Sequence, residues 1–396
     1  MRSLYALVSF AVAVSALPPL LVNESPNQLY PVQDEFEVEY AGFDVDLDEL
    51  RLVQFEGQEP VWMTELEKIH AKAQGLRFFD ITDAQELGST ARFNGKVQAS
   101  FPTPNATEQV GSVIKTLSTD GMKTNLEKFS GFRNRYYRAE TGRQSQQWLL
   151  SKISETTAKY APKGLQDLIS LAEFPHSWGQ NSIIARINGT APTGTVIVGA
   201  HQDSTNMWPF LPAPGADDDG SGSVTILEAY RALIASDFRP VENVEFHWYS
   251  AEEGGLLGSQ AVAKDYAARN VPVIAMSQFD MTAWVKKGTR EEVGIITDFV
   301  DTSLTEFNKQ VVDAYLDIPY VETKCGYACS DHASWAKAGY ASSFTIESAF
   351  ENSNPNIHST NDRIDISPEF SFDHMLEFAK LVVGYTIELA GWKKND

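Results

Sequence analysis

The sequence contains few cysteines, few basic residues and no long apolar run. Of its 396 residues, 2 are Cys, 32 are Lys or Arg, and 53 are Asp or Glu, which gives a formal net charge of −21. Two cysteines exclude a disulfide-dense miniature fold and a zinc site made of four thiolates. The shortage of cationic side chains argues against a nucleic-acid partner, because phosphate binding requires a cationic surface. Nothing approaches the length of about 20 apolar residues that spans a bilayer, so no membrane partner is expected either.

Several signatures of catalysis and of repeat folds are also missing. The chain has no nucleophile elbow, Walker loop or dinucleotide fingerprint, and no internal repeat or low-complexity tract. It is, however, 43% hydrophobic, with 8 Trp, 14 Tyr and 22 Phe. This composition excludes disorder and supports a large core, in one large domain or two ordinary ones.

The first 16 residues predict a secretory signal peptide. Arg2 precedes an apolar run over residues 4–14, and small residues follow at positions 14–16. An apolar strand or a membrane anchor is the alternative, but a run of about 11 residues is too short to span a bilayer. A secreted, extracellular chain could be glycosylated at the sequons that begin at Asn23, Asn105 and Asn188.

Residues 17–77 form an acidic segment with 13 Asp or Glu and 4 Lys or Arg. Acidic and apolar residues alternate over residues 36–40 and 43–47, and a helix is predicted from residue 61 to about residue 73, ended by Gly75. Either a removable propeptide or a permanent solvated extension fits this composition. The propeptide is favoured because the segment follows a signal peptide, and cleavage near Arg77 would leave Phe78 as the first residue.

From residue 78 onward, helices are predicted at residues 105–117, 122–137 and 142–157. Short β-prone runs at residues 196–199, 244–249, 273–277 and 343–346 then alternate with helical stretches such as residues 221–234. A last helix is predicted at about residues 373–389. This alternation predicts an α/β sheet covered by helices on both faces.

Acidic residues and a histidine follow three of the predicted strands. His201 follows the first strand, Glu252 and Glu253 follow the second, and Asp280 follows the third. Open α/β sheets bind ligands just beyond the carboxyl ends of their strands. The sequence therefore predicts that these side chains gather at one edge of the sheet.

The residues near these strand ends suit a metal site. Asp203 could orient the imidazole of His201 through its second ring nitrogen. Three consecutive carboxylates at residues 217–219 repel one another unless a dication lies nearby, and one of them is expected to cap the next helix. Gly254 and Gly255 permit a turn that brings both Glu252 and Glu253 to one site, where one could bind metal and the other accept a proton from bound water.

The spacing of residues along the chain leaves two questions open: which further histidine is a ligand, and what the two cysteines do. His332 and His358 are both candidates for a further ligand, and spacing alone does not choose between them. Cys325 and Cys329 could chelate a metal with His332, whereas an oxidising compartment favours a disulfide. So short a loop would stabilise little globally, but it would pin Tyr327.

Six ordered motifs resemble the secreted di-zinc leucine aminopeptidases of the M28 peptidase type, especially the fungal ones. The resemblance covers roughly residues 78–392. Its motifs are Ala-His201-Gln-Asp203-Ser-Thr, Ala-Pro-Gly-Ala-Asp217-Asp218-Asp219, Ala-Glu252-Glu253, Gln-Phe-Asp280-Met-Thr, Cys325-Gly-Tyr327-Ala-Cys329-Ser-Asp-His-Ala-Ser-Trp, and Ile-His358-Ser-Thr.

The resemblance implies a fold, a domain order and a set of roles. The fold would be a mixed, mostly parallel sheet with helices on both faces, of the zinc aminopeptidase (phosphorylase/hydrolase-like) type, with a signal peptide at residues 1–16, a propeptide at 17–77 and a catalytic domain at 78–396. The implied roles are as follows: His201 and Asp280 hold one zinc, Glu253 and His358 hold the other, Asp218 bridges both, Glu252 is the general base, Tyr327 binds the substrate carbonyl, Asp203 supports the ligands, and Cys325 and Cys329 form a disulfide. An apolar pocket is implied at Met281, Ile296, Phe344, Ile346, Phe350 and Ile357.

The implied activity is hydrolysis of the N-terminal peptide bond of peptides with a free N-terminus and a leucine-like first residue. Two Zn²⁺ facing three carboxylates would polarise a bridging water, whose pKa would fall to about 7, and Glu252 would take its proton. The enzyme would be a monomer, with its propeptide as inhibitor or folding aid. Two alternatives stay open: another di-zinc amidohydrolase (a carboxypeptidase, amino-acylase or glutaminyl cyclase), or a noncatalytic binding ectodomain, which would predict a broken ligand set.

Overall fold

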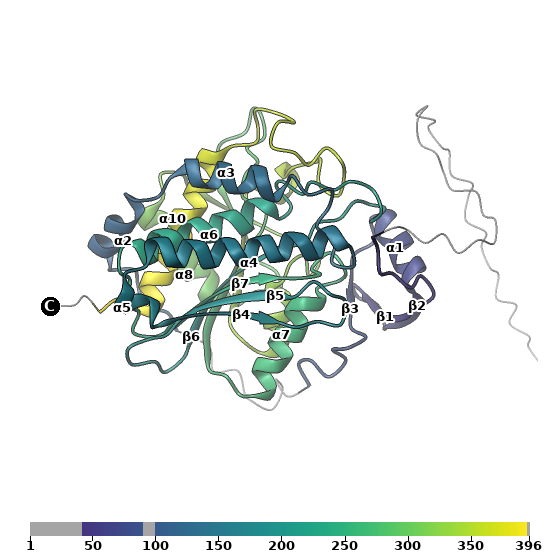
Figure 1. Cartoon of the computed structure of the whole chain (residues 1–396), viewed down its shortest axis with the longest axis horizontal. Coiled ribbons are helices and arrows are strands. Elements are labelled where there is room, and N and C mark those ends of the chain that lie inside the picture. The colour runs from purple at the N-terminus through teal and green to yellow at the C-terminus, as the bar shows by residue number, and fades with distance from the viewer. Residues whose placement is uncertain (1–41, 90–99, 394–396) are drawn as a thin grey trace, which may run out of the picture. The chain divides into compact units, whose positions relative to one another are not determined.

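An eight-stranded sheet forms the centre of the protein in the computed structural model, which describes residues 42–89 and 100–393 (Figure 1). The strand order is β10-β9-β11-β8-β6-β7-β5-β4. The strands are β4 (Ile169–Phe174), β5 (Ser182–Ile187), β6 (Thr195–His201), β7 (Asn243–Tyr249), β8 (Val273–Phe279), β9 (Val293–Ile296), β10 (Tyr320–Thr323) and β11 (Ser342–Ile346). Strand β6 runs parallel to β7 and β8, β11 to β8, and β10 to β9, while the other three neighbouring pairs are antiparallel. The predicted mixed, mostly parallel sheet is confirmed.

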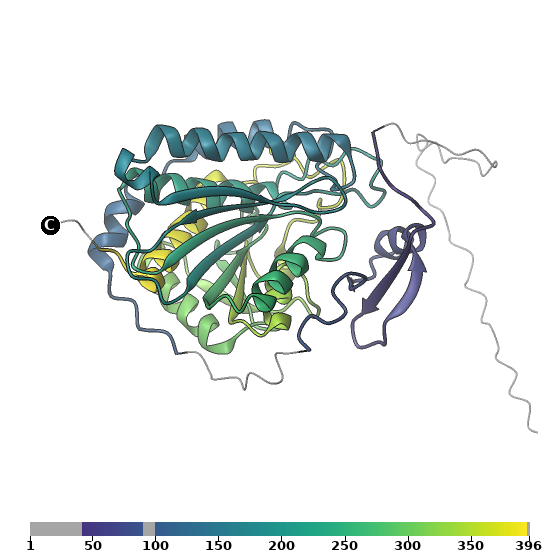
Figure 2. The same cartoon turned by 60° about the horizontal axis from the view of Figure 1, so that its bottom comes forward.

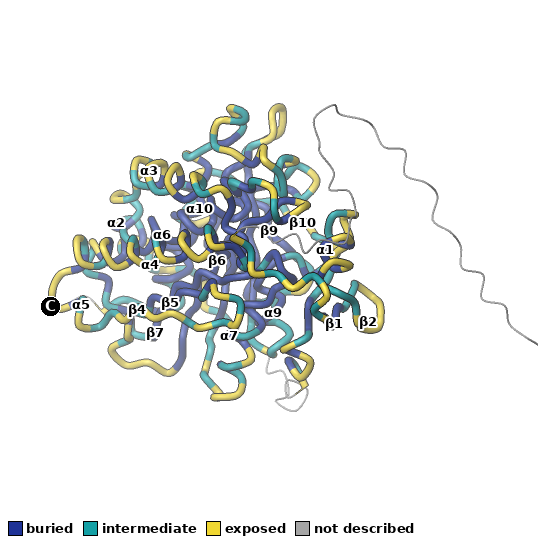
Figure 3. Tube along the Cα trace, turned by 45° about the vertical axis from the view of Figure 1, so that its right-hand side comes forward, coloured by how far each residue is buried: buried dark blue, intermediate teal, exposed yellow. Residues whose placement is uncertain are grey.

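The central strands are buried on both faces, as Figure 3 shows for β6 and its neighbours. All seven residues of β6 and all seven of β7 are buried. Along β6 the side chains alternate between two cores, with Val196 and Val198 in one and Ile197 in the other. Because neither face meets water, these strands are rich in apolar residues, although β7 also buries Asn243, Glu245 and His247.

Helices cover the two faces of this sheet (Figure 2). One face packs against α2 (Thr107–Ile114), α4 (Glu140–Tyr160), α6 (Gly220–Ala235), α8 (Thr302–Tyr315) and α10 (Phe372–Ala390). The other packs against α7 (Leu257–Ala268) and α9 (His332–Ala338). Helix α3 (Thr119–Phe129) packs against α6, and α5 (Lys163–Gln166) is a single turn. The helix predicted over residues 122–137 extends too far toward the C-terminus, because α3 ends at Phe129 and residues 130–139 form turns and loops.

Residues 50–80 contain a small antiparallel sheet of order β2-β1-β3 and one helix, α1. The strands are β1 (Leu50–Phe55), β2 (Val61–Thr64) and β3 (Phe78–Asp80), and α1 spans Glu65–Ala73. The expected cleavage point at Arg77 directly precedes β3, which pairs with β1.

The predicted start of the helix at residue 61 is wrong. Residues Val61–Thr64 pair with β1, and the helix begins at Glu65. A capping box sets this start: the hydroxyl of Thr64 accepts the Glu67 N–H at 3.2 Å, and the Glu67 carboxylate accepts the Thr64 N–H at 2.7 Å. At the other end Gly75 takes a left-handed φ of 78°, as its residue type suggested.

Some expectations concern residues outside the described ranges, namely the signal peptide at residues 1–16, the sequon at Asn23 and the alternating stretch 36–40. Residues 43–47 form no strand, apart from an isolated bridge between Phe43 and Ala139. Within residues 42–89 and 100–393, none of the helices combines the length and the apolarity that crossing a membrane requires.

Candidate metal centre

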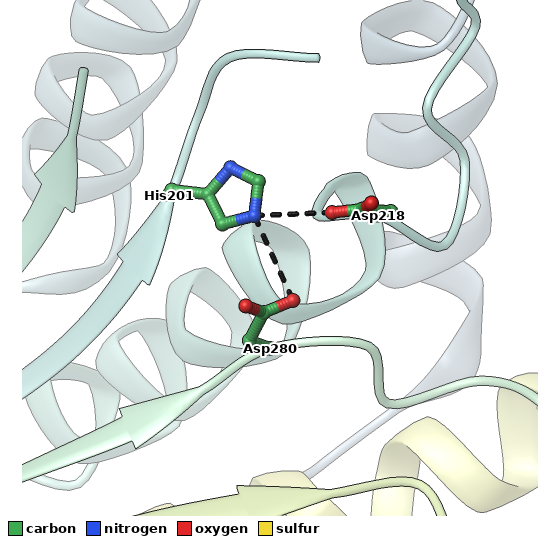
Figure 4. Close-up of side chains that lie close together, drawn as sticks. All are labelled: His201, Asp218 and Asp280. Carbon is green, nitrogen blue, oxygen red and sulfur yellow. Dashed lines mark ion pairs between the residues drawn. The ribbon is translucent and has the colours of Figure 1, made fainter. Parts of the chain in front are cut away.

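Strands β6 and β8 and the loop before α6 bring three side chains together. His201 is the last residue of β6, Asp280 directly follows β8, and Asp218 lies in the loop that leads into α6. The Nε2 atom of His201 is 3.1 Å from Oδ1 of Asp218 and 3.6 Å from Oδ1 of Asp280 (Figure 4). All three side chains are buried. Their short separations show that they converge at the carboxyl edge of the sheet.

A second group of three lies next to the first and shares Asp218 with it. Glu253 follows β7, and His358 lies in the loop before α10. The Nε2 atom of His358 is 3.1 Å from Oδ2 of Asp218 and 3.0 Å from Oε2 of Glu253. The two oxygens of Asp218 thus face different histidines, which makes Asp218 a bridge between the groups.

The donor atoms of both groups fit zinc. In each group one imidazole nitrogen and two carboxylate oxygens lie within 4.8 Å of one another, and these are ligand types that zinc binds. His201 Nε2, Asp280 Oδ1 and Glu253 Oε1 are buried without a hydrogen-bond partner. Buried polar atoms normally have a hydrogen-bond partner, and a bound cation would serve as the partner of these three atoms.

The electrostatics of the groups favour positive charge. Burial alone would lower the pKa of His201, but the carboxylates of Asp280, Asp203 and Asp218 raise it well above its ordinary value. Burial likewise opposes the charge on His358, yet Glu253 and Asp218 raise its pKa to about 9. A site whose carboxylates stabilise a buried cation this strongly suits a metal ion.

A cleft opens beside the two groups and is lined by Asp218, Asp280 and His358. Glu252 and Glu253 both line this cleft as well. The chain turns on both sides of them: Ala251, before the pair, adopts a φ of 56°, and Gly255, after the pair, a φ of 102°. The carboxylate of Asp203 accepts the backbone N–H of Glu252 at 3.1 Å and that of Glu253 at 3.2 Å, which fixes the turn. Asp203 also approaches Nδ1 of His201, with its backbone carbonyl at 3.2 Å and its carboxylate at 3.5 Å. Burial raises the pKa of Glu252 well above its ordinary value.

The predicted disulfide between Cys325 and Cys329 is present. Tyr327, which lies between them, lines the cleft together with Glu252 and Asp218. Burial raises the pKa of the Tyr327 hydroxyl, so it stays protonated and can donate a hydrogen bond.

His332 belongs to neither group of metal-ligand candidates. It begins α9 and is buried, with its ring stacked on Phe344 at 4.9 Å between centroids. The chelate of His332 with the two cysteines, which the spacing had allowed, is therefore wrong. The tertiary structure brings His358 to the site instead.

The cleft has a volume of about 270 Å³ and an apolar wall. The wall residues form one hydrophobic cluster with Ile296, which is buried behind them and does not line the cleft. The lining members of that cluster are Met281, Phe344, Ile346, Phe350, Ile357 and Cys329.

Of the three consecutive carboxylates, only Asp218 belongs to the metal-ligand groups. Asp219 caps α6 by accepting the N–H of Gly222 at 2.9 Å. Asp217 accepts the N–H of Ala283 at 3.1 Å. Spacing alone had not separated these roles.

Other polar residues at the site were not anticipated. Ser330 donates a hydrogen bond to Oδ2 of Asp280 at 2.6 Å, and Asp362 binds backbone N–H groups beside Asp218. The sequence offers one local signal for Asp362, its position four residues after His358.

Comparison with known proteins decides the family. Residues 182–383 match peptidase family M28. The chain is 49% identical over 395 residues to Leucine aminopeptidase 1 of Trichoderma harzianum, with 96% of this chain and 95% of that protein covered. The chain belongs to peptidase family M28. It is a zinc-dependent aminopeptidase, as the resemblance of its motifs implied.

Further relatives of this M28 peptidase agree. Leucine aminopeptidase 1 of Fusarium vanettenii is 49% identical over 362 residues, with 88% of this chain and 90% of that protein covered. The crystal structure of the LapA aminopeptidase of Legionella pneumophila superimposes with a TM-score of 0.77 at 25% identity, covering 87% of this chain and 99% of that chain. A glutaminyl cyclase of Porphyromonas gingivalis shares the fold alone, with a TM-score of 0.53 at 19% identity, over 69% of this chain and 99% of that chain.

Proposed function

We propose that this M28 aminopeptidase holds two zinc ions and removes leucine-like apolar residues from the N-terminus of peptides. His201 and Asp280 would hold one ion, Glu253 and His358 the other, and Asp218 both. The observation that carries the proposal is the carboxylate of Asp218, whose two oxygens each lie 3.1 Å from a different histidine. A carboxylate in that position suits two cations better than one.

The chain's own residues supply proton transfer and charge stabilisation. When bound, the two zinc ions would polarise the attacking water and the scissile carbonyl. Glu252 lines the cleft beside the ligands and would take the proton of that water, then return it to the departing amine. The protonated hydroxyl of Tyr327 would donate a hydrogen bond to the carbonyl oxygen as negative charge develops there.

The shape of the cleft accounts for a preference at the N-terminal residue. Its apolar wall, formed by Met281, Phe344, Ile346, Phe350 and Ile357, would bury a leucine side chain. The buried acids beside it would receive the neutral α-amino group of a free N-terminus. An acylated N-terminus has no such amine and would bind poorly.

The test is Glu252→Gln in the proteolytically processed enzyme. The variant should retain two zinc ions per chain and lose turnover by about 10²–10⁴-fold, the usual contribution of general acid–base catalysis. Glu155→Gln, on the exposed face of α4, serves as the matched control and should leave both quantities unchanged. A wild-type stoichiometry of one zinc, or full turnover by Glu252→Gln, would refute the proposal.

The proposal includes a secreted precursor with a signal peptide at residues 1–16 and a propeptide at 17–77. The sequon residues Asn105 and Asn188 are exposed, so both could be glycosylated. The disulfide suits an oxidising compartment. Mass spectrometry of the secreted protein would test the processed N-terminus and the glycans together.

The propeptide would act as an inhibitor, because its helix α1 reaches the cleft. Lys72 Nζ is 2.5 Å from Oε2 of Glu253 and 2.7 Å from its backbone carbonyl. The Arg77 guanidinium lies 4.9 Å from the centre of the Tyr327 ring. Residues 75–78 line the cleft beside them. In the uncleaved chain, Lys72 would compete with the second zinc ion for Glu253, and the turn after α1 would hinder substrate entry.

A further inference from the structure

The bridging position of Asp218 depends on its backbone. Asp218 lies in a loop before α6 rather than in a strand, so no ladder of sheet hydrogen bonds holds it. Its two oxygens must nevertheless point at two histidines that come from distant parts of the chain. Other contacts must therefore keep the loop in place.

One residue, Asp362, binds three consecutive backbone N–H groups of this loop. Its Oδ1 accepts the N–H of Asp217 at 3.0 Å, and its Oδ2 accepts the N–H of Asp218 at 3.0 Å. Its backbone carbonyl accepts the N–H of Ala216 at 3.1 Å. Asp362 is only 1% exposed, so water does not compete for these hydrogen bonds.

Asp362 also connects two of the three loops that supply the second group of ligands, those of Asp218 and His358. It follows His358 by four residues, in the same loop before α10. The side-chain amide of Asn354 donates to Oδ2 of Asp217 at 3.0 Å and lies 3.5 Å from Oδ1 of Asp362. The loop of His358 and the loop of Asp218 are thus joined through buried hydrogen bonds rather than through a metal.

Positive charge lies near this acidic group. The buried guanidinium of Arg135 donates to the carbonyls of Pro214 and Gly215, at the start of the same loop. Burial lowers the pKa of Arg135 to about 10, and Asp362 is the first among the nearby acids that oppose this fall. Arg135 therefore helps to offset the cost of burying a carboxylate beside the metal ligands.

We propose that Asp362 is a positioning residue of this aminopeptidase, which holds the backbone of Asp218 so that one carboxylate serves both metal ions. The inference rests on the proposed two-zinc function. Asp203 and Asp219 show the same use of a carboxylate: Asp203 binds the N–H groups of Glu252 and Glu253, and Asp219 binds that of His201 at 3.0 Å. Carboxylates that accept backbone N–H groups thus surround the carboxylates that bind metal.

Asp362→Asn tests the inference with little change in volume. The amide keeps one acceptor oxygen but places an NH₂ group against one of the two backbone donors, so that one N–H loses its partner. Because Asp218 is shared, the affinity for both zinc ions should fall. Loss of a group that supports metal ligands typically lowers metal affinity by about 10- to 100-fold.

The experiment uses the processed enzyme and measures zinc affinity by competition with a chromophoric chelator. The visible absorption of the cobalt-substituted protein reports ligand geometry, which a general loss of stability would not change. Asp365→Asn is the matched control, because that carboxylate is exposed and pairs with the exposed Arg363. We expect a weaker zinc affinity and an altered cobalt spectrum for Asp362→Asn, and wild-type values for the control.

Wild-type zinc affinity and an unchanged cobalt spectrum in Asp362→Asn would overturn the inference. If that variant does not fold, Asn354→Ala replaces it: the loss of the connecting amide should lower zinc affinity in the same direction, and unchanged affinity would again refute the role. A wild-type enzyme that binds fewer than two zinc ions would instead refute the proposed function, so the two failures are distinguishable.

Discussion

Replacing Lys72 by Met tests whether the N-terminal segment controls the enzyme. The ammonium group of Lys72 is 2.5 Å from Glu253, whose side chain is only 2% exposed, whereas the side chain of Lys72 is 20% exposed. Met keeps most of the length of the side chain and its apolar contacts but removes the charge. The substitution therefore isolates the polar contacts of Lys72 with Glu253, the ion pair and the hydrogen bond to its carbonyl, from the rest of the interface.

The size of the effect follows from the burial of this pair. Truncating one partner of a buried, hydrogen-bonded charge pair costs about 2–5 kcal/mol. Because Lys72 is partly exposed and Glu253 keeps His358 as a second partner at 3.0 Å, the low end of that range applies. About 2 kcal/mol corresponds to roughly a 30-fold change in an equilibrium constant. The fraction of uncleaved chains in which α1 has left the cleft should rise by roughly that factor.

The assay compares hydrolysis of leucine p-nitroanilide by the uncleaved chain before and after limited proteolysis near Arg77. Wild type should gain activity on cleavage. Uncleaved Lys72→Met should already show activity well above uncleaved wild type, and should bind its second zinc ion more tightly. Lys163→Met, at an exposed position on α5, is the control and should behave as wild type. Full activity of the uncleaved wild-type chain, or no gain from Lys72→Met, would refute the reasoning.

Three further predictions concern stability and specificity. Burial lowers the pKa of His332 from 6.5 to about 3. Below pH 6.5 the unfolded chain therefore binds a proton that the folded chain does not, so the stability of the protein falls as the pH falls. Between pH 7 and pH 5, urea unfolding of the metal-free wild type should show a loss about 2 kcal/mol larger than that of His332→Gln, and equal losses would contradict this. Replacing Cys325 and Cys329 by Ser should reduce kcat through Tyr327 while zinc content stays constant, and should lower the free energy of unfolding by no more than about 2 kcal/mol, because the closed loop is short. Unchanged kcat would show that the disulfide does not hold Tyr327. Ile346→Ala, which enlarges the apolar wall, should reduce kcat/KM for leucine substrates by about 10-fold or more and spare phenylalanine substrates, and a uniform loss for both would argue against a pocket there.

Much of the central fold could be predicted because its signals are local. Strands β6, β7 and β8 are rich in β-branched, aromatic and other apolar residues, and the residues that follow them or end them include His201, Glu252 and Asp280. The two strands nearest each edge of the sheet, β10 and β9 at one side and β5 and β4 at the other, were not predicted. Strands β9 and β10 have only four residues, and β4 and β5 are partly exposed, so their apolar patterns are weaker. The start of α1 was misplaced because the apolar residues of β2 precede the capping box directly.

The sequence by itself determined which residue types could form a metal site and placed three of them at strand ends, because parallel strands end at one edge of a sheet. Spacing along the chain did not decide between His332 and His358 or separate Asp218 from its two acidic neighbours; the resemblance of the motifs implied both choices, and the tertiary structure brings these side chains together. Only the tertiary structure decided that Lys72 reaches the cleft and that Asp362 binds the loop of Asp218. Those decisions depend on how loops distant in the chain pack against one another. No short window of sequence records that packing, whereas the burial and distances of the folded chain do.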